Sequence, residues 1–401
     1  MADQPLKIRA NPGGGLDPSQ VWDRDDTIAE IWQTLGRPQS VYLTGERRSG
    51  KTSILKKMKA NLPDGYSMVY ADVEDVNSPG EFANRLFIKV GEELPSVVKA
   101  RGWLVRKLKD LGITRVSAAG FGIEFAEIRD RQWPVVIHQV IEALQESADQ
   151  PVVLVLDELP QMLTNIAERG QPLDARQALD VLRELRQSSS RVHMIFTGSI
   201  GLHHVLKHLT ELGGTWAPIN DMAVIDVPPL SKRDAVGLAR VLIINENIRT
   251  DDVEALALAM ATRVDGAPFY IQHLAAALAN RKGTDPPADP TTIDDIINDK
   301  LQDPQDAWKF GHFVTRVRPY YGQAAPLASA LLDIVSVEGP VSFERLLRLV
   351  PAHLEAVNDA DRVAEILDLL QNDYYLTRDS EGKLRFRQPL MARAWRARRY
   401  Q

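Results

Sequence analysis

The stretch Gly45-Glu46-Arg47-Arg48-Ser49-Gly50-Lys51-Thr52 decides how the rest of the chain is interpreted. It follows the short apolar run Val41-Tyr42-Leu43 and precedes a strongly helical stretch, Thr52 to Asn61. It matches the pattern G-x-x-x-x-G-K-[ST], in which glycines let backbone N–H groups turn inward around phosphate oxygens. A helix that begins near Lys51 directs the positive end of its dipole toward the anion. The strand–loop–helix context therefore predicts a phosphate-binding loop.

Lys51 and Thr52 carry the chemistry of this loop. Lys51 supplies a mobile positive charge for the β- and γ-phosphates of a nucleotide, and Thr52 offers a hydroxyl to Mg²⁺. The alternative is a glycine-containing turn with a surface lysine, but the strand before the motif and the helix after it favour the phosphate site. The residues expected to contact the nucleotide here are Gly45, Glu46, Arg47, Arg48, Ser49, Gly50, Lys51, Thr52 and Ser53.

An apolar run from Val152 to Leu156 ends in two acids, Asp157 and Glu158. A strand buried on both faces has such a continuous apolar run, and ligands gather at the C-terminal ends of parallel strands. We therefore expect Asp157 in the Mg²⁺ shell and Glu158 as the general base that orients and deprotonates an attacking water. The alternative is a solvated acidic turn.

Another strand pattern, Val192 to Phe196, ends in the polar residues Thr197-Gly198-Ser199. A hydroxyl at this point is placed to contact the γ-phosphate or the lytic water, and we take Ser199 as a catalytic residue. Thr197 fits the same role, and the sequence does not distinguish the two. An ordinary turn after a strand is the alternative.

Strand and helix patterns alternate through the first 230 residues. Strands are expected at 41–43, 67–72, 152–156, 192–196 and 222–227, and helices at 25–35, 52–61, 79–93 and 174–187. This alternation predicts an α/β core over 21–230, with a parallel sheet covered by helices on both faces. Residues 95–131 break the rhythm and are taken as a basic insertion. Residues 1–20 are polar and glycine-containing, and we expect a flexible arm.

The pattern changes after Pro228-Pro229. Residues 231–290 are helical and end in a segment with three prolines. Residues 291–401 form a further domain. Its helix patterns and two short strand-like runs lie at 291–301, 326–337, 342–349, 361–372, 374–377 and 384–386.

Composition excludes several classes of protein. The chain has 401 residues, of which 44% are apolar and 25% charged, as in ordinary globular proteins. Its longest aliphatic run, Val152 to Leu156, is far shorter than the ~20 residues of a membrane-spanning helix. The chain has no cysteine and no apolar signal-peptide region at its start, so we expect a cytoplasmic protein without disulfides. The net charge of −6 gives no global attraction to nucleic acid.

The motifs together resemble the AAA+-related P-loop ATPases, and within them the archaeal-type ATPase family. That family is close to the signal-transducing ATPases with numerous domains (STAND) and more distant from origin-recognition initiators. Leu156-Asp157-Glu158 and the polar strand end carry the likeness, as does Val21-Trp22-Asp23-Arg24-Asp25 before the first helix, where Asp23 stands in place of the usual glycine. Gly266-Ala267-Pro268-Phe269-Tyr270-Ile271 resembles the Gly-x-Pro motif of a helical lid, which would bring Pro268 near the nucleotide. A plain break between two helices is the alternative.

The resemblance covers about residues 20–400 and implies the strand order 5-1-4-3-2. It implies a helical lid over 231–290 and a winged-helix domain over 291–401, with its wing and closing helix at Leu384-Arg385-Phe386-Arg387-Gln388-Pro389-Leu390. It also implies that the protein binds ATP with Mg²⁺ and hydrolyses the β–γ bond, slowly or with stimulation by a partner.

Two functional classes stay open. The first is an ATP-dependent switch in signalling or defence that acts through protein partners or through self-oligomerisation. The second is a DNA-acting ATPase, such as an initiator-like loader or a transposition regulator, that binds duplex DNA through its winged helix. Basic residues gather at that end of the chain: Lys383, Arg385, Arg387, Arg393, Arg396, Arg398 and Arg399. A solvated helix end explains the same residues.

Two smaller sets of residues complete the expectations. An arginine finger, which stabilises transferring phosphate from a neighbouring subunit, has Arg183, Arg186 and Arg191 as candidates. His203 and His204 are adjacent, and neighbouring helical positions are not expected to face one metal site.

Overall fold

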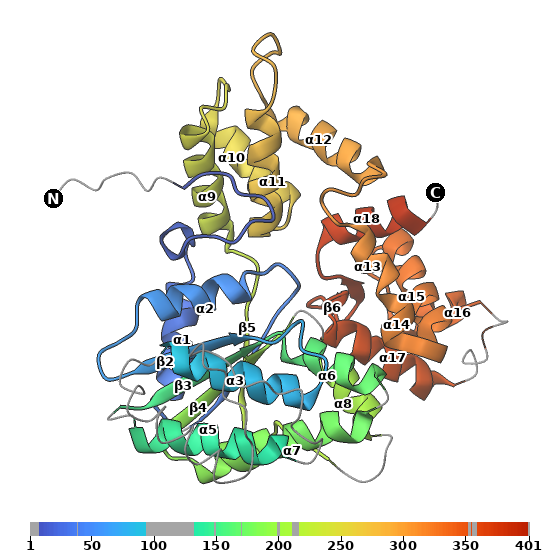
Figure 1. Cartoon of the computed structure of the whole chain (residues 1–401). Helices are drawn as coiled ribbons and strands as arrows, with labels where there is room; N and C mark the ends of the chain where they lie inside the picture. The colour runs from blue at the N-terminus through green and yellow to red at the C-terminus, as the bar shows by residue number, and fades with distance from the viewer. Residues whose placement is uncertain are drawn as a thin grey trace. The chain divides into compact units, whose positions relative to one another are not determined.

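A computed structural model describes residues 8–37, 39–93, 132–147, 150–169, 171–198, 201–210, 216–351, 354 and 359–399 (Figure 1). Two compact units emerge from its contacts. Unit 1 contains the described residues up to Asp23, residues 48–50 and the chain from Pro228 onward. Unit 2 contains residues 24–47 and 51–227. The insertion expected at 95–131 lies outside the described residues.

Unit 2 is built on a five-stranded sheet. Its strands are β1 (Val41–Thr44), β2 (Ser67–Asp72), β3 (Val152–Asp157), β4 (Val192–Thr197) and β5 (Ala223–Asp226). The order is β2-β3-β4-β1-β5 and every pair is parallel. The α/β core and the strand order implied by the resemblance are therefore confirmed.

Helices cover both faces of this sheet. One face carries α1 (Asp25–Leu35) and α2 (Lys51–Ala60), and the other carries α3 (Pro79–Glu93), α5 (Trp133–Ser147), α6 (Leu159–Glu168), α7 (Pro172–Ser188) and α8 (Leu202–Thr210). Side chains alternate along a strand, so Val153 and Val155 pack toward α1 and α2 while Leu154 and Leu156 pack on the opposite face. The sequence patterns did not predict α5, α6 or α8.

Unit 1 packs its helices around one hydrophobic core. Its helices are η1 (Pro18–Gln20), α9 (Lys232–Asn245), α10 (Val253–Arg263), α11 (Pro268–Ala279), α12 (Pro290–Gln302), α13 (Gly311–Thr315), α14 (Val317–Tyr321), η3 (Gly322–Ala324), α15 (Ala325–Glu338), α16 (Phe343–Leu349), α17 (Ala360–Asn372) and α18 (Pro389–Arg399). An antiparallel hairpin, β6 (Leu376–Arg378) and β7 (Leu384–Phe386), precedes α18. Among the described helices of both units, none is both long and apolar enough to cross a bilayer.

The beginning of the described chain is anchored, in contrast to the flexible arm expected over residues 1–20. Ile8 is 1% exposed and belongs to the core of unit 1. The Ala10 N–H donates to the Glu246 carboxylate at 2.8 Å, and the Asn11 N–H donates to the Gln272 side-chain oxygen at 3.0 Å. The composition of this segment did not predict these contacts, because they are made by an isolated isoleucine and by backbone N–H groups.

Asp265 caps α18 from the loop that precedes α11. Its carboxylate accepts the Leu390 N–H at 2.9 Å, in the first turn of α18. Burial raises the pKa of Asp265 to about 6, although this hydrogen bond and the charges of Arg385 and Arg393 oppose the rise. Asp265 has φ 54, a left-handed conformation that asparagine also accepts readily. The protein therefore retains a partly buried carboxylate where a neutral acceptor would fit.

We expect Asp265→Asn to stabilise the protein by about 1–2 kcal/mol at pH 7, since the amide keeps an acceptor but is never charged. The native pKa of about 6 exceeds the ordinary 3.8, so the native state binds more protons than the unfolded state between these values. The contribution of Asp265 to wild-type stability therefore falls as pH rises through that window, and the variant should lack this loss. Urea unfolding at pH 7 and at pH 4 measures both effects, and equal stability of the two proteins at pH 7 would contradict the expectation.

Candidate functional site

The candidate site lies at the C-terminal edge of the sheet in unit 2. Residues 45–47 follow β1, and α2 begins at Lys51, as the phosphate-loop motif predicts. Asp157 ends β3 and Thr197 ends β4. Because β1, β4 and β3 are neighbours and run parallel, their C-terminal ends meet at one edge.

Lys51 is a buried cation, with 6% of its surface exposed. Its ammonium donates to the carbonyl oxygens of Gly45 at 2.8 Å and Glu46 at 3.0 Å. Burial lowers the pKa of Lys51 to about 8, while the charges of Glu158 and Asp157 favour the protonated form. An ammonium that is desolvated inside a glycine-containing loop is favourably placed to bind an anion.

Asp157 gathers two hydroxyl groups on one carboxylate oxygen. Thr52 donates to Oδ2 at 2.9 Å and Tyr70 donates to the same Oδ2 at 2.6 Å. Asp157 is 2% exposed, and burial raises its pKa above the ordinary value while the two hydroxyl donors oppose the rise. Hydroxyl and carboxylate oxygens are the ligands that Mg²⁺ takes from proteins, so Thr52 and Asp157 fit this cation.

Glu158 occupies the sharp turn between β3 and α6. Its φ of 62 is in the left-handed region, which is uncommon for a residue other than glycine and which often marks a functional position. Gly198 lies against this turn: a Cβ added at Gly198 would be 2.5 Å from Cδ of Pro160 and 3.6 Å from Oε2 of Glu158. The ends of β3 and β4 therefore bring the Glu158 carboxylate next to the polar strand end.

Thr197 is the hydroxyl-bearing residue of the polar strand end that the structure describes. It is fully buried, and none of the described residues offers its Oγ1 a hydrogen-bond partner. Thr197 alternates with Phe196 and so shares the face of Ile195, which packs with α1 and α2 as Val155 does. A buried hydroxyl without a partner is rare and favours a ligand contact. Ser199, our predicted catalytic residue, lies outside the described residues.

The remaining predicted contacts divide between the units. Glu46 and Ser49 are buried, and Arg47 and Ser53 are half-buried. Residues 48–50 group with unit 1, where the Arg48 guanidinium lies 4.0 Å from the ring centroid of Phe269 and donates to the Trp308 carbonyl at 2.9 Å. Gly50 has φ 98, a conformation that strongly favours glycine at that step of the loop. Pro268, at the start of α11, belongs to unit 1, and its contact with a nucleotide stays a prediction.

Tyr70 is the site residue that sequence reasoning missed. It lies on the edge strand β2, where Asp72 pairs with Asp157. Because side chains alternate along a strand, Tyr70 lies on the same face of the sheet as Asp157, and the strand pattern of the sequence contains this information. The alternating pattern alone does not show that this tyrosine turns toward the carboxylate.

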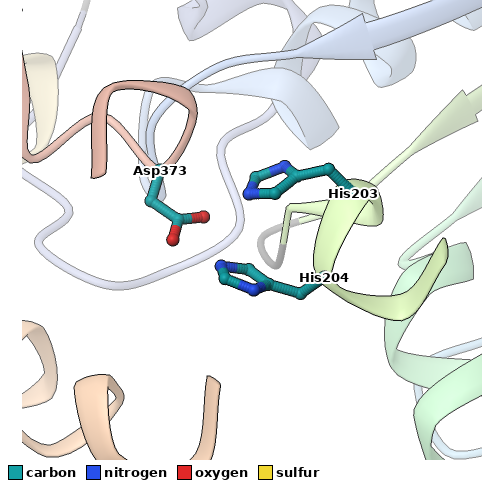
Figure 2. A group of neighbouring side chains, drawn as sticks. All are labelled: His203, His204 and Asp373. Carbon is teal, nitrogen blue, oxygen red and sulfur yellow. The ribbon is translucent and has the colours of Figure 1, made fainter. Parts of the chain in front are cut away.

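The two adjacent histidines, which are not expected to face one metal site, are in contact with each other. Figure 2 shows His203 and His204 next to each other, and both belong to the first turn of α8. Their ring centroids are 4.4 Å apart. Asp373, also drawn there, belongs to unit 1, where it accepts the Tyr321 hydroxyl at 2.6 Å. Within either unit alone, the described residues bring together no third ligand for a metal site.

Arg186 makes its contacts inside unit 2. Its guanidinium pairs with Asp221 at 2.8 Å, donates to the Pro218 carbonyl at 2.6 Å, and its side chain is 1% exposed. A finger arginine must reach a neighbouring subunit, so Arg186 does not fit that role. Arg191 is exposed and Arg183 half-buried, and these two remain candidates.

The basic C-terminal helix is also committed to internal contacts. Arg396 donates to the Ser336 carbonyl, and Arg398 donates to the Asp303 carbonyl at 2.7 Å and to Asp306 at 3.1 Å. Arg399 pairs with Asp333 at 3.3 Å. Two arginines of α18, Arg398 and Arg399, are therefore paired with carboxylates of unit 1, and Arg396 is bound to a carbonyl there.

Comparison with known proteins gives the domain type and the fold. Residues 34–206 match the family described as AAA domain, so the chain contains an AAA-type P-loop ATPase domain. None of the curated proteins compared matches the sequence. The Walker-type ATPase PABY2304 of Pyrococcus abyssi aligns over 98% of both chains, with 15% identity and a TM-score of 0.64. The ORC2 protein of Aeropyrum pernix, in its ADPNP–ADP complexes, aligns over 99% of this chain and 96% of its own, with 13% identity and a TM-score of 0.53. At these identities the two structures show a shared fold.

We expect Gly198→Ala to destabilise the protein by about 1–3 kcal/mol, because its Cβ overlaps the ring of Pro160, which has no other rotamer to adopt. The clash should also displace Glu158. Thermal unfolding measures the loss, with Gly80→Ala in α3 as the matched control, since its Cβ meets only Ser78 Oγ at 3.9 Å. If both variants melt together with the wild type, the close approach of β4 to the turn after β3 is not rigid.

Proposed function

We propose that this chain binds MgATP, hydrolyses its β–γ bond and acts as a conformational switch through protein partners or a second copy of itself. The observation that carries the proposal is the buried Lys51 ammonium on loop carbonyls, next to a carboxylate that binds the first hydroxyl of α2. A phosphate group would satisfy Lys51 better than two neutral carbonyls do.

Each site residue has a defined task in this proposal. Lys51 and the N–H groups of residues 45–52 bind the β- and γ-phosphates. Thr52 and Asp157 hold Mg²⁺, which when bound neutralises charge on the phosphates. Glu158 orients the attacking water and accepts its proton. Thr197 donates its hydroxyl to the γ-phosphate or to that water, a role that Ser199 also fits by sequence.

The proposal divides unit 1 into a lid over 231–290 and a winged-helix domain over 291–401. The order of α15, α16, α17, β6 and β7 supports the second part, as does the isolated antiparallel bridge that pairs Val341 with Leu384 of the hairpin. A helical lid and a winged helix would transmit the nucleotide state to partners.

DNA as the partner is the weaker alternative. It relied on the basic C-terminus, and Arg396, Arg398 and Arg399 all bind acceptors of unit 1. Arg385 and Arg387 near the hairpin are half-buried, so a smaller basic surface remains. Salt-dependent binding to duplex DNA would support this alternative, whereas capture of a protein partner without DNA affinity supports the switch.

We expect Lys51→Ala to weaken the binding of MgATP at least tenfold, because a charge-assisted phosphate contact contributes roughly 1.5–3 kcal/mol. Calorimetric titration measures the affinity. Lys56→Ala is the control, since Lys56 is an exposed residue of the same helix. Equal affinity of the Lys51 variant and the wild type would remove the phosphate-loop assignment.

Glu158→Gln should keep the affinity for ATP and lower turnover by about 10²–10⁴-fold, the range for a positioned general base. Steady-state phosphate release tests this, with Glu168→Gln at the exposed end of α6 as the control. Undiminished turnover in the Glu158 variant would assign the base elsewhere. A wild type that binds ATP without turnover, even with a partner present, would be a binding switch only.

A further inference from the structure

Tyr70 connects the edge of the sheet to the cation-binding carboxylate. Its hydroxyl donates to Asp157 Oδ2 at 2.6 Å, the shortest of the contacts that this carboxylate makes with described side chains. Burial and the charge of Asp157 raise the pKa of Tyr70 well above its ordinary value. The phenol therefore stays protonated and acts as a donor.

The backbone of Tyr70 is fixed by a second set of contacts. Its N–H donates to Glu93 Oε2 at 2.9 Å, at the end of α3, and Glu93 pairs with Lys59 of α2 at 2.6 Å. Because β2 is an edge strand, this N–H has no neighbouring strand on that side, and Glu93 takes that place. Tyr70 is consequently held at its main chain as well as at its hydroxyl.

Thr52 and Tyr70 approach Asp157 from different elements but share one acceptor atom. With both donors on Oδ2, the carboxylate cannot rotate without breaking two hydrogen bonds, and Oδ1 is the oxygen left for a cation or its water shell. A hydrogen bond to a charged group is among the stronger kinds in proteins. Orientation of ligands by a neighbouring donor commonly sets the affinity of a cation site.

We propose that Tyr70 is a positioning residue for the divalent cation: it holds Asp157 in the orientation that binds Mg²⁺ with the nucleotide. This inference rests on the proposed binding of MgATP and adds a residue that neither the loop motif nor the acidic motif contains. The proposal predicts that loss of the Tyr70 hydroxyl affects the binding of the cation and not the binding of the nucleotide. Removal of the hydroxyl should weaken cation binding while nucleotide contacts with Lys51 and the loop stay intact.

The experiment uses Tyr70→Phe in the full chain, a change that removes the hydroxyl and keeps the ring. The probes are ADP in the presence of EDTA, measured by calorimetry, and Mn²⁺ in the presence of saturating ADP, measured by electron paramagnetic resonance. We expect ADP affinity without divalent cation to stay within about twofold of the wild type and Mn²⁺ affinity to fall about tenfold, since one hydrogen bond to a charged group is lost.

Tyr66→Phe is the matched control. Tyr66 immediately precedes β2, at the opposite end from Asp157, and its ring lies 5.1 Å from that of Trp32. This variant should bind ADP and Mn²⁺ like the wild type. Thermal unfolding of both variants detects any general loss of stability.

Each other outcome overturns the proposal. Unchanged or tighter Mn²⁺ binding in Tyr70→Phe would mean that the hydroxyl does not position Asp157 for the cation, or that it competes with the cation. A parallel loss of ADP affinity, Mn²⁺ affinity and melting temperature would make Tyr70 a structural residue only.

If the wild type binds no ADP under any condition, the proposed function fails and the role of Tyr70 fails with it. If the wild type binds ADP and Mn²⁺ and Tyr70→Phe behaves identically, only the role of Tyr70 fails.

Discussion

The arrangement at the sheet edge depends on the burial of one positive charge, the Lys51 ammonium. A desolvated ammonium is costly unless acceptors and anions surround it. The loop supplies two carbonyl oxygens, and the end of β3 and the turn after it supply Asp157 and Glu158, whose charges favour the protonated lysine. Those acids reach the loop because β4 alone separates β3 from β1 and all three strands run parallel. The strand order thus serves an electrostatic requirement as well as a packing one.

The same requirement explains why the acids are held so firmly. Asp157 is nearly inaccessible to water, so its charge must be stabilised by donors from the protein, and Thr52 and Tyr70 provide them. Glu158 follows in a left-handed conformation that only a closely packed turn maintains, and the absence of a side chain at Gly198 makes the packing possible. A site assembled in this way loses little freedom when a ligand binds, which leaves more of the interaction energy for affinity.

Much of this was predictable because the decisive signals are local in the sequence. The phosphate loop, the apolar strand that ends in Asp157-Glu158 and the alternation of strands and helices are read from consecutive residues, and the strand order follows from the resemblance. The partner of a long side chain is not local. Arg186 donates a hydrogen bond to Asp221, Arg398 donates to Asp306, and Tyr70 donates to Asp157. The two partners of each pair are 35 to 92 residues apart in the sequence. A run of basic residues therefore indicated a charged surface where Arg396, Arg398 and Arg399 bind acceptors within unit 1.

Helix α2 is tied to the sheet at both of its ends, and this limits which parts of unit 2 can respond to a nucleotide. Its first turn is joined to β3 through Thr52 and Asp157, and its last turn is joined to β2 through Lys59 and Glu93. A helix held at two points 7 residues apart cannot tilt without breaking an ion pair and a hydrogen bond to a buried carboxylate. Movement on phosphate binding therefore costs less free energy in elements that are not held to the sheet by such contacts. The loop residues 48–50 group with unit 1 instead, although they lie between two segments of unit 2, and Arg48 donates there to the Trp308 carbonyl. A switch built on this site would accordingly signal through those residues, while α2 and the sheet remain a fixed frame.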